Sequence, residues 1–333
     1  MANFIELIDL ASERLGGAAL AANDEFFAPK ESLVKPSRPE WKEGLYTDRG
    51  KWMDGWETRR RREPGHDWCL IRLGLPGVVS GVCVDTTHFS GNHPEACSIE
   101  ACDAAGGVNA GELAAMTWTE ILARSALSGN TENLFSIRPG GRVTHLRLNI
   151  YPDGGVARLR VYGRAAPDWE ALAAAGGAVD LVAAEHGGLV LAVSDDCFSS
   201  RQHLILPGRG RDMSDGWETR RRRGPGHDWA VLELGRLGVI RRIEVDTLHF
   251  KGNAPGACSI VIARAPGVSL PELLDPRRAW TPLLSETKLT PDALHVFERE
   301  VLAAGEATHA RFHIYPDGGV SRLRLFGRPA ASP

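Results

Sequence analysis

The sequence has no net basic charge, no long apolar run and no basic leader. Its formal net charge is −3 at pH 7, so no overall positive field attracts nucleic acid or an anionic membrane. No stretch of eighteen uninterrupted apolar residues is present, and the first residues carry acidic side chains where a signal peptide would be basic. We therefore expect no membrane span and no signal peptide, and neither nucleic acid nor membrane among the partners.

Paired-cysteine motifs and the common catalytic motifs are also missing. None of the six cysteines forms a CxxC pair, so neither a disulfide framework nor a zinc ribbon is indicated. We expect reduced thiols and a cytoplasmic location. The chain has no GxSxG, no HExxH, no phosphate-cradling loop and no dinucleotide fingerprint, which excludes the usual hydrolase and nucleotide-binding signatures.

What the chain does have is a long internal repeat. The string DGWETRRRR occupies 54–62 and returns at 215–223, each time followed closely by PGHDW. The offset of 161 residues also aligns two further histidine positions, and it grows to 164 at the later string IYPDGGV. Each copy is far longer than a solenoid repeat, so the sequence predicts a duplicated domain. We place the first domain at 1–165, a linker at 166–186 and the second domain at 187–333.

Within each copy the pattern is that of β-strands. In HLRLNIY, Leu146, Leu148 and Ile150 alternate with Arg147, Asn149 and Tyr151, which predicts one core face and one outer face. The string YPDGGV that follows has turn chemistry and predicts a hairpin. Helical periodicity is confined to 4–15, 168–177 and 270–275. Short alternating runs among 37 glycines and 20 prolines favour an all-β chain of two tandem β-sandwiches.

The arginine string admits three interpretations. Regular alternation would place two of its four arginines on each face, and the inward pair would need carboxylates such as Glu57 or a bound anion. A structural network of Arg, Glu and Trp is one interpretation, and an anion clamp made of guanidinium forks is the second. A nucleic-acid groove is the third, and the acidic total disfavours it.

Four of the eleven histidines fall at matching positions in the two copies. His66 and His227 lie in GHDW beside an aspartate, where a histidine can act as a general base or a metal ligand. His88 and His249 follow VDT in both copies, and regular alternation would place them opposite the preceding aspartate. For each histidine alone, a structural role in a loop is the competing interpretation. The copies differ at one position of interest, because Asn149 of the first is matched by His313 of the second.

The strings DGWETRRRR, GHDW, VDTxHFxGN and IYPDGGVxRLRxxG, each present twice, resemble the allantoicase family over nearly the whole chain. The resemblance implies two tandem jelly-roll β-sandwich domains and hydrolysis of allantoate to ureidoglycolate and urea in purine degradation. Allantoate has one carboxylate suited to an arginine fork and two ureido groups whose N–H donors need Asp, Glu or Asn acceptors. We also expect a homo-oligomer. A non-catalytic jelly-roll module that binds a carbohydrate or another small ligand is the alternative.

The reaction needs a base for water and an acid for the departing urea. A divalent metal ion could supply part of this chemistry, and the sequence leaves that cofactor open. His313 shares a strand face with Arg311 and Tyr315, so we expect the second copy to dominate catalysis. The catalytic candidates are His227, Asp228, Asp246, His249 and His313. The candidates for substrate binding are Glu218, Arg220, Arg222 and Asn253 in the second copy and Arg59, Arg61, His66 and His88 in the first.

Overall fold

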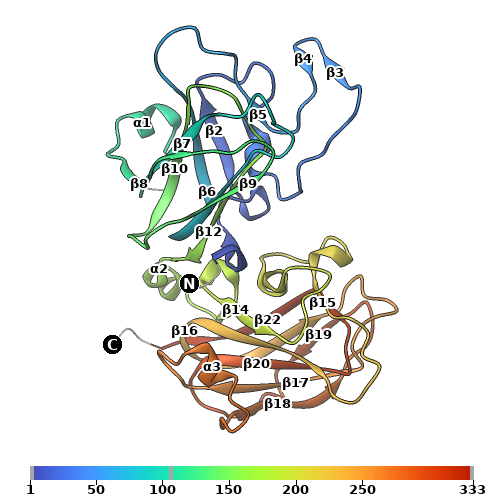
Figure 1. The fold of residues 1–333 in the computed structure, drawn as a ribbon. Helices are drawn as coiled ribbons and strands as arrows, with labels where there is room; N and C mark the ends of the chain where they lie inside the picture. Colours follow the sequence, from blue (N-terminus) through green and yellow to red (C-terminus); the bar gives the residue numbers. More distant parts are fainter. Residues whose placement is uncertain (1–3, 105–107, 331–333) are drawn as a thin grey trace. The chain divides into compact units, whose positions relative to one another are not determined.

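The computed structural model describes residues 4–104 and 108–330. The chain divides into two compact units, Met1–Ala166 (unit 1) and Pro167–Pro333 (unit 2). Nearly all regular structure in both is antiparallel β-sheet (Figure 1). The predicted all-β class and the duplicated jelly-roll sandwich are confirmed.

The elements of unit 1 follow one another as η1 (Phe4–Glu6), β1 (Ile8–Asp9), η2 (Glu13–Leu15), β2 (Ala18–Ala22), η3 (Lys30–Val34), β3 (Tyr46–Thr47), β4 (Gly50–Lys51), β5 (Trp56–Glu57), β6 (Asp67–Asp85), β7 (Ala96–Cys102), α1 (Ala110–Ala114), β8 (Thr119–Ala126), β9 (Glu132–Ser136), β10 (Val143–Tyr151), β11 (Gly155–Val156) and β12 (Arg158–Ala165). The hairpin of β3 and β4 stands away from the sandwich (Figure 1).

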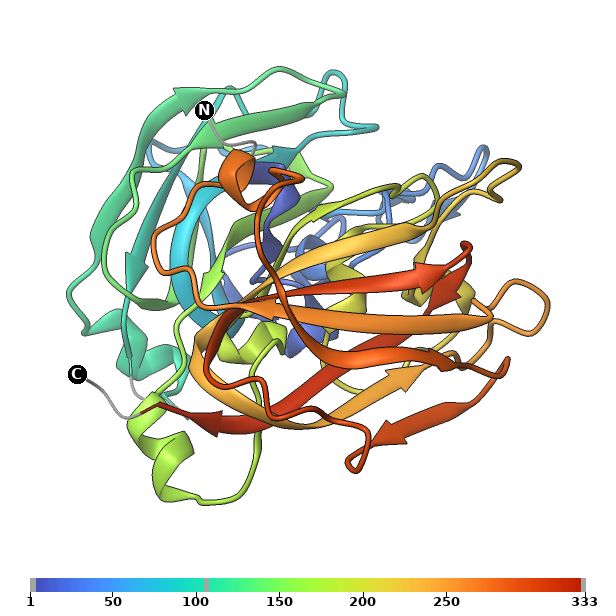
Figure 2. The same ribbon diagram turned by 90° about the horizontal axis from the view of Figure 1, so that it is seen from below.

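Unit 2 repeats most of this order, with a helix in place of η1 and a 3-10 turn in place of the β3–β4 hairpin. Its elements are α2 (Trp169–Ala174), β13 (Val179–Asp180), η4 (Ala184–His186), β14 (Leu189–Val193), η5 (Arg201–Ile205), η6 (Met213–Asp215), β15 (Trp217–Glu218), β16 (Asp228–Asp246), β17 (Ala257–Ala263), α3 (Leu270–Leu273), β18 (Thr281–Lys288), β19 (Leu294–Phe297), β20 (Ala307–Tyr315), β21 (Gly319–Val320) and β22 (Arg322–Pro329). Its long strands lie side by side in Figure 2.

One long strand in each unit belongs to both layers of the sandwich. The first part of β6 pairs with β2 and β10, and its second part pairs with β12 and β9. In unit 2, β16 has the same two sets of partners, namely β14 and β20, then β22 and β19. The start and the end of each long strand therefore lie in different layers.

Alternation of side chains makes the core, as the sequence predicts. Leu146, Leu148 and Ile150 of β10 are fully buried, and Phe312 and Ile314 of β20 are buried in the same way. A fully buried leucine or isoleucine side chain contributes roughly 1.5–3 kcal/mol relative to an exposed one. The intervening residues of each strand face outward, and those outward positions carry the polar side chains.

Two sequence expectations are wrong. YPDGGV does not close a hairpin, because β10 and β12 both pair with β6 and not with each other; the string carries the chain from one layer to the other. Residues 4–15 do not form a helix but two 3-10 turns around β1, since pairing of β1 with β12 outweighs their weak helical periodicity. The helices predicted near 168–177 and 270–275 are present as α2 and α3.

The segment predicted as a linker, 166–186, contains regular structure. It holds α2 and then β13, which pairs with β22 as β1 pairs with β12. Residues 179–180 therefore lie in the sheet of unit 2.

Candidate functional site

The first half of the string DGWETRRRR packs against the chain that crosses between the two layers. Its strand β5 pairs with β11 in that crossing. Trp56 is fully buried, and its Nε1 donates to the backbone carbonyl of Asp24 at 2.8 Å. The carboxylate of Asp54 accepts from the fully buried guanidinium of Arg158 at 2.6 Å. Unit 2 repeats both contacts, in Trp217 with Asp195 and in Asp215 with Arg322. These contacts support the structural interpretation for the first half of the string.

Only the third arginine of each string turns inward. Arg61 and Arg222 are half-buried, and the other arginines of both strings are exposed. The expected two-and-two split is wrong because β5 ends at Glu57, so alternation stops before the arginines begin. Arg61 pairs with the buried carboxylate of Asp67 at 2.7 Å. The carboxylate partner is therefore an aspartate, and not Glu57 as suggested.

The predicted residues at the entry to the string form short polar pairs. Glu218 accepts from the Nδ2 of Asn253 at 2.5 Å, and Arg220 pairs with Asp195 at 2.7 Å. Unit 1 repeats them, in Glu57 with Asn92 at 2.7 Å and in Arg59 with Asp24 at 2.6 Å.

A pair of histidines lies on the outer face of the sheet in unit 2. The Nε2 of His227, directly before β16, is 2.8 Å from the Nδ1 of His313 on β20. Strand register places Trp229 on one side of His313 and Ser259 on the other. The ring of Tyr315 lies 4.7 Å from that of His227, and its hydroxyl is 2.9 Å from the Oγ of Ser259. The sequence indicated both histidines, but their direct contact comes from the pairing of β16 with β20.

The electrostatic environment holds this pair neutral. Burial, followed by the charge of Arg311 and by His227, lowers the pKa of His313 to about 4. Burial, followed by Arg311 and Arg222, also lowers the pKa of His227. At neutral pH one imidazole therefore donates the shared proton, and the pair keeps a lone pair that can accept another.

Arg311 is the cation beside the histidines. Its guanidinium carbon lies 4.5 Å from the ring centroid of Trp229, and burial lowers its pKa. Within the part of the chain that the structure describes, its Nε is buried without a hydrogen-bond partner and it forms no ion pair. A half-buried guanidinium in this state favours a bidentate anion.

Asp228 supports the loop that carries His227. It is 2% exposed, and it accepts from the Oγ of Ser194 at 3.0 Å and from the guanidinium of Arg222. The backbone N–H of Arg222 donates in turn to the carboxylate of Asp317 at 2.8 Å. Asp228 therefore orients the loop through Arg222 and Ser194. Ser194 and Ser259 had no distinguishing signal in the sequence.

Unit 1 has a different arrangement at the same place. Asn149, which stands where unit 2 has His313, donates from Nδ2 to Glu100 at 3.0 Å. Glu100 also accepts from the Nε of Arg147 at 2.7 Å, and the pKa of Glu100 is lowered chiefly by that hydrogen bond. Unit 2 has Val261 opposite Arg311, whereas unit 1 has Glu100 opposite Arg147. The cation of unit 1 is thus neutralised within the chain.

His66 keeps part of the environment of its counterpart His227. Its ring lies 4.9 Å from that of Tyr151, and the guanidinium carbon of Arg124 lies 4.2 Å from the Tyr151 centroid.

His88 and His249 lie in tight turns and not on strands. β6 ends at Asp85, so the expectation that His88 lies opposite Asp85 on a continuing strand is wrong, and the same holds for His249 beyond Asp246. Both histidines have a φ of 73°.

The side-chain contacts of this second pair of histidines are structural. The Nε2 of His88 lies 3.4 Å from the carbonyl oxygen of Pro39, and that of His249 lies 2.9 Å from the carbonyl of Gly210. Asp246 pairs with Arg209 at 3.0 Å.

The two facing nitrogens of the histidine pair are not arranged to hold a metal ion together. The Nε2 of His227 and the Nδ1 of His313 face each other in a hydrogen bond, so these two nitrogens do not point at a common ligand. Over residues 4–104 and 108–330, no group of three or more His, Cys, Asp or Glu side chains is arranged to hold a metal ion. The same residues include no helix long and apolar enough to cross a membrane. All six cysteines are free.

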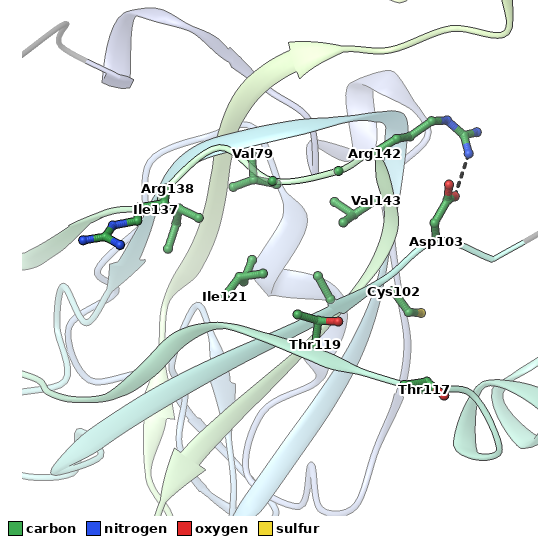
Figure 3. Close-up of a pocket in the computed structure, with 13 residues that line it drawn as sticks. Val79, Cys102, Asp103, Thr117, Thr119, Ile121, Ile137, Arg138, Arg142 and Val143 are labelled. Atoms are coloured by element: carbon green, nitrogen blue, oxygen red, sulfur yellow. Dashed lines mark hydrogen bonds and ion pairs between the residues drawn. The ribbon is translucent and has the colours of Figure 1, made fainter.

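A separate cavity of about 300 Å³ opens in unit 1 among Val79, Ile121, Ile137 and Val143 (Figure 3). An ion pair at its rim joins Arg142 and Asp103 at 2.6 Å. Its lining contains no histidine and a single carboxylate, so it lacks an acid–base pair for proton transfer.

Comparison with known proteins gives one consistent result. The model of the family described as the allantoicase repeat matches residues 8–166 and 179–330. A probable allantoicase of Burkholderia mallei is 50% identical over 320 residues, which cover 96% of this chain and 94% of that protein. A probable allantoicase of Pseudomonas aeruginosa is 49% identical over 98% of each chain. The crystal structure of the allantoicase of Saccharomyces cerevisiae superposes with a TM-score of 0.80 at 35% identity, covering 97% of this chain and 93% of that one.

Proposed function

The chain belongs to the allantoicase family, and we propose that it hydrolyses allantoate to ureidoglycolate and urea at the histidine pair of unit 2. The observation that supports this proposal is a pair of substitutions on one face of the sheet, in two neighbouring strands. Asn149 and Glu100 of unit 1 become His313 and Val261 in unit 2. The exchange supplies a neutral imidazole and removes the carboxylate that would occupy Arg311. Nothing favours the alternative of a non-catalytic binding module.

Binding begins at Arg311. The carboxylate of allantoate accepts two N–H bonds from its guanidinium, which Trp229 supports from one face. His313 lies two residues away on the same face of β20, so a molecule anchored by its carboxylate presents its central carbon to the imidazoles. Confinement of this kind replaces part of the entropic barrier of the reaction.

The chemistry is a proton exchange across one C–N bond. Water adds its oxygen to the central carbon while that carbon loses one ureido nitrogen. The pair accepts the proton of water at a free imidazole nitrogen, and it returns a proton to the departing ureido nitrogen, so urea leaves neutral. Tyr315 and Ser259 fix the ring planes during this exchange.

Substrate binding also raises the pKa of the two histidines in this proposal. The charge of Arg311 is one of the causes that lower the pKa of both histidines. A bound carboxylate neutralises that charge, so the pKa of the pair rises toward the working pH only when substrate is present. The imidazoles become stronger bases when there is a water molecule to activate.

The finer assignments are part of this proposal. We assign the chain to the hydrolases that act on carbon–nitrogen bonds of linear amidines, in the cytoplasm and as a homo-oligomer, on the basis of the motifs that it shares with the family. Six free cysteines, five of them buried, are compatible with a reducing compartment.

Activity and site are tested together with a matched pair of variants. Purified protein is expected to release urea and ureidoglycolate from allantoate in equal amounts, and His227→Ala is expected to abolish turnover while His66→Ala retains it. Urea released with ammonia and carbon dioxide in place of ureidoglycolate would overturn the chemistry. Loss of turnover in His66→Ala alone, with folding intact, would move the site to unit 1.

A further inference from the structure

A second polar cavity lies in unit 1 beside its arginine string. It has a volume of about 560 Å³, and its lining includes Phe27, Glu57, Asn92, Arg60 and Arg62. We call it the arginine pocket. It contains none of the residues to which hydrolysis is assigned above.

The lining of the arginine pocket includes a carboxylate that is partly withdrawn from water. Glu57 is half-buried in β5, and its Oε1 accepts the Nδ2 of Asn92 at 2.7 Å. Burial raises the pKa of Glu57. The remaining lone pairs of such a carboxylate are best satisfied by an N–H donor.

The lining of the arginine pocket also includes three arginines, two of which have no ion-pair partner among the described residues. Arg59 is engaged by Asp24 at 2.6 Å. Arg60 and Arg62 are both exposed, and neither forms an ion pair within the described ranges 4–104 and 108–330. Two guanidinium groups are therefore available for an anionic group in the same pocket as Glu57.

One lining residue distinguishes this pocket from the corresponding place in unit 2. His93 contributes to the lining, with its Nδ1 2.9 Å from the carbonyl oxygen of Ser90, so its Nε2 remains for a ligand. The aligned residue of unit 2 is Ala254. Unit 1 therefore adds an imidazole to the carboxylates and arginines that line this pocket.

We propose that the arginine pocket is a second, non-hydrolytic binding site for small carboxylates that also carry an amide or ureido N–H group. The carboxylate pairs with Arg60 and Arg62, and the N–H group donates to Glu57. The lining also contains the carboxylate of Asp153, which accepts the backbone N–H of Arg61 at 2.8 Å. Charges of both signs inside one pocket select a ligand with both features over a simple anion. The inference rests on the proposed function in one respect, because the product of that reaction belongs to this ligand class.

The test is calorimetric titration of the whole chain with N-carbamoylglycine, a ureido carboxylate. Wild type is expected to bind two molecules per chain, one at Arg311 and one in the arginine pocket. Arg62→Ser should weaken one site by on the order of tenfold and spare the other, and Glu57→Gln should weaken the same site. Arg299→Ser, which removes an exposed arginine of unit 2, is the control and should leave both sites unchanged.

The outcomes separate this inference from the proposed function. A single site per chain, or two sites with unchanged affinities in Arg62→Ser, overturns the second site even if the chain hydrolyses allantoate. If Arg62→Ser loses one binding site and wild type does not hydrolyse allantoate, the arginine pocket is supported and the proposed function is overturned. Because Arg62 is exposed, its replacement tests binding without dependence on the packing of β5.

Discussion

The two units have one fold but different polar side chains on one face of the sheet. His66 and Tyr151 of unit 1 correspond to His227 and Tyr315 of unit 2, with ring separations of 4.9 and 4.7 Å. Core positions of the strand also differ, since Leu148 is matched by Phe312, but the outward change of Asn149 to His313 is the one that alters the polar groups. Outward positions of a β-sandwich can be exchanged without disturbing the core, so a duplicated domain can carry different polar groups on the same fold.

The two units also differ in how the charge of the corresponding arginine, Arg147 or Arg311, is compensated. In unit 1 the charge of Arg147 is neutralised by its ion pair with Glu100 at 2.7 Å. In unit 2 Arg311 has no such carboxylate opposite it, since Val261 stands there. An ion pair within the protein stabilises the fold, whereas an open guanidinium is available to a ligand. The open site is the better candidate for a substrate that carries a carboxylate.

The largest effect should come from making unit 2 resemble unit 1. His313→Asn removes one partner of the proton-exchanging pair, so we expect kcat to fall by roughly 10²-fold or more. The reverse change, Asn149→His, is the matched control and should leave kcat within about a factor of two, because Glu100 still occupies Arg147. Steady-state assays of urea release measure both. Equal losses of kcat in the two variants would show that the units contribute to one common site.

A second comparison concerns the packing beneath β8 and β18. In unit 2 the backbone N–H of Leu302 donates to the carbonyl of Leu283 at 2.9 Å, and Leu283 is 1% exposed. At the aligned place in unit 1, Ile121 is half-buried and lines the open cavity of Figure 3. Leu283→Ala should therefore lower the free energy of unfolding by about 2–5 kcal/mol.

The control for this packing prediction is Ile121→Ala. It should cost only about 1 kcal/mol, since less apolar surface is returned to water. Chemical denaturation with intrinsic fluorescence gives both values. Equal costs would mean that the unit 1 cavity closes in solution.

The fold was largely predictable from the sequence because its signals are local or repeated. Alternation in β10 and β20 identified the core residues, and the duplication identified the two units. The pairing of β6 with both layers was not predictable. This strand has 19 residues, and its own sequence contains no signal for where it passes from one layer to the other. The helix predicted at 4–15 was wrong for a similar reason, since β1 within this segment pairs with the distant strand β12.

The sequence could name residues of the candidate site one by one, but not how they lie together. His227 and His313 were both candidates, yet only the register of β16 with β20 brings their rings together. Asp246 and His249 were candidates from the same kind of local pattern, and the structure gives them structural contacts with Arg209 and Gly210. The change from Glu100 to Val261 was visible in the two copies, but its meaning depends on the strand opposite it.

A smaller effect is expected from Arg311→Lys. The positive charge stays, but a lysine cannot form the two parallel N–H bonds of a guanidinium, so KM should rise by about tenfold with a smaller change in kcat. Arg147→Lys in unit 1 is the matched control and should leave KM unchanged. An unchanged KM in Arg311→Lys would remove the carboxylate anchor from the mechanism.

The smallest effect concerns stability in acid, and it isolates His313 from the chemistry. Its pKa is lowered to about 4 in the folded protein, whereas an unfolded histidine titrates near 6.5. Between these values the unfolded chain binds more protons, so the stabilisation is fully present above pH of about 6.5 and is lost as the pH falls toward about 4. His313→Asn removes this proton uptake, so its unfolding free energy should fall less steeply between these pH values than that of wild type. Because the side chain is half-buried, solvent screening keeps the difference small.

Denaturation midpoints measured across this pH range test the slope, with Asn149→Ala as the control that should retain the wild-type dependence. A wild-type slope in His313→Asn would mean that His313 takes up its proton equally in the folded and unfolded states, and the neutral pair on which the comparison of the two units depends would be lost.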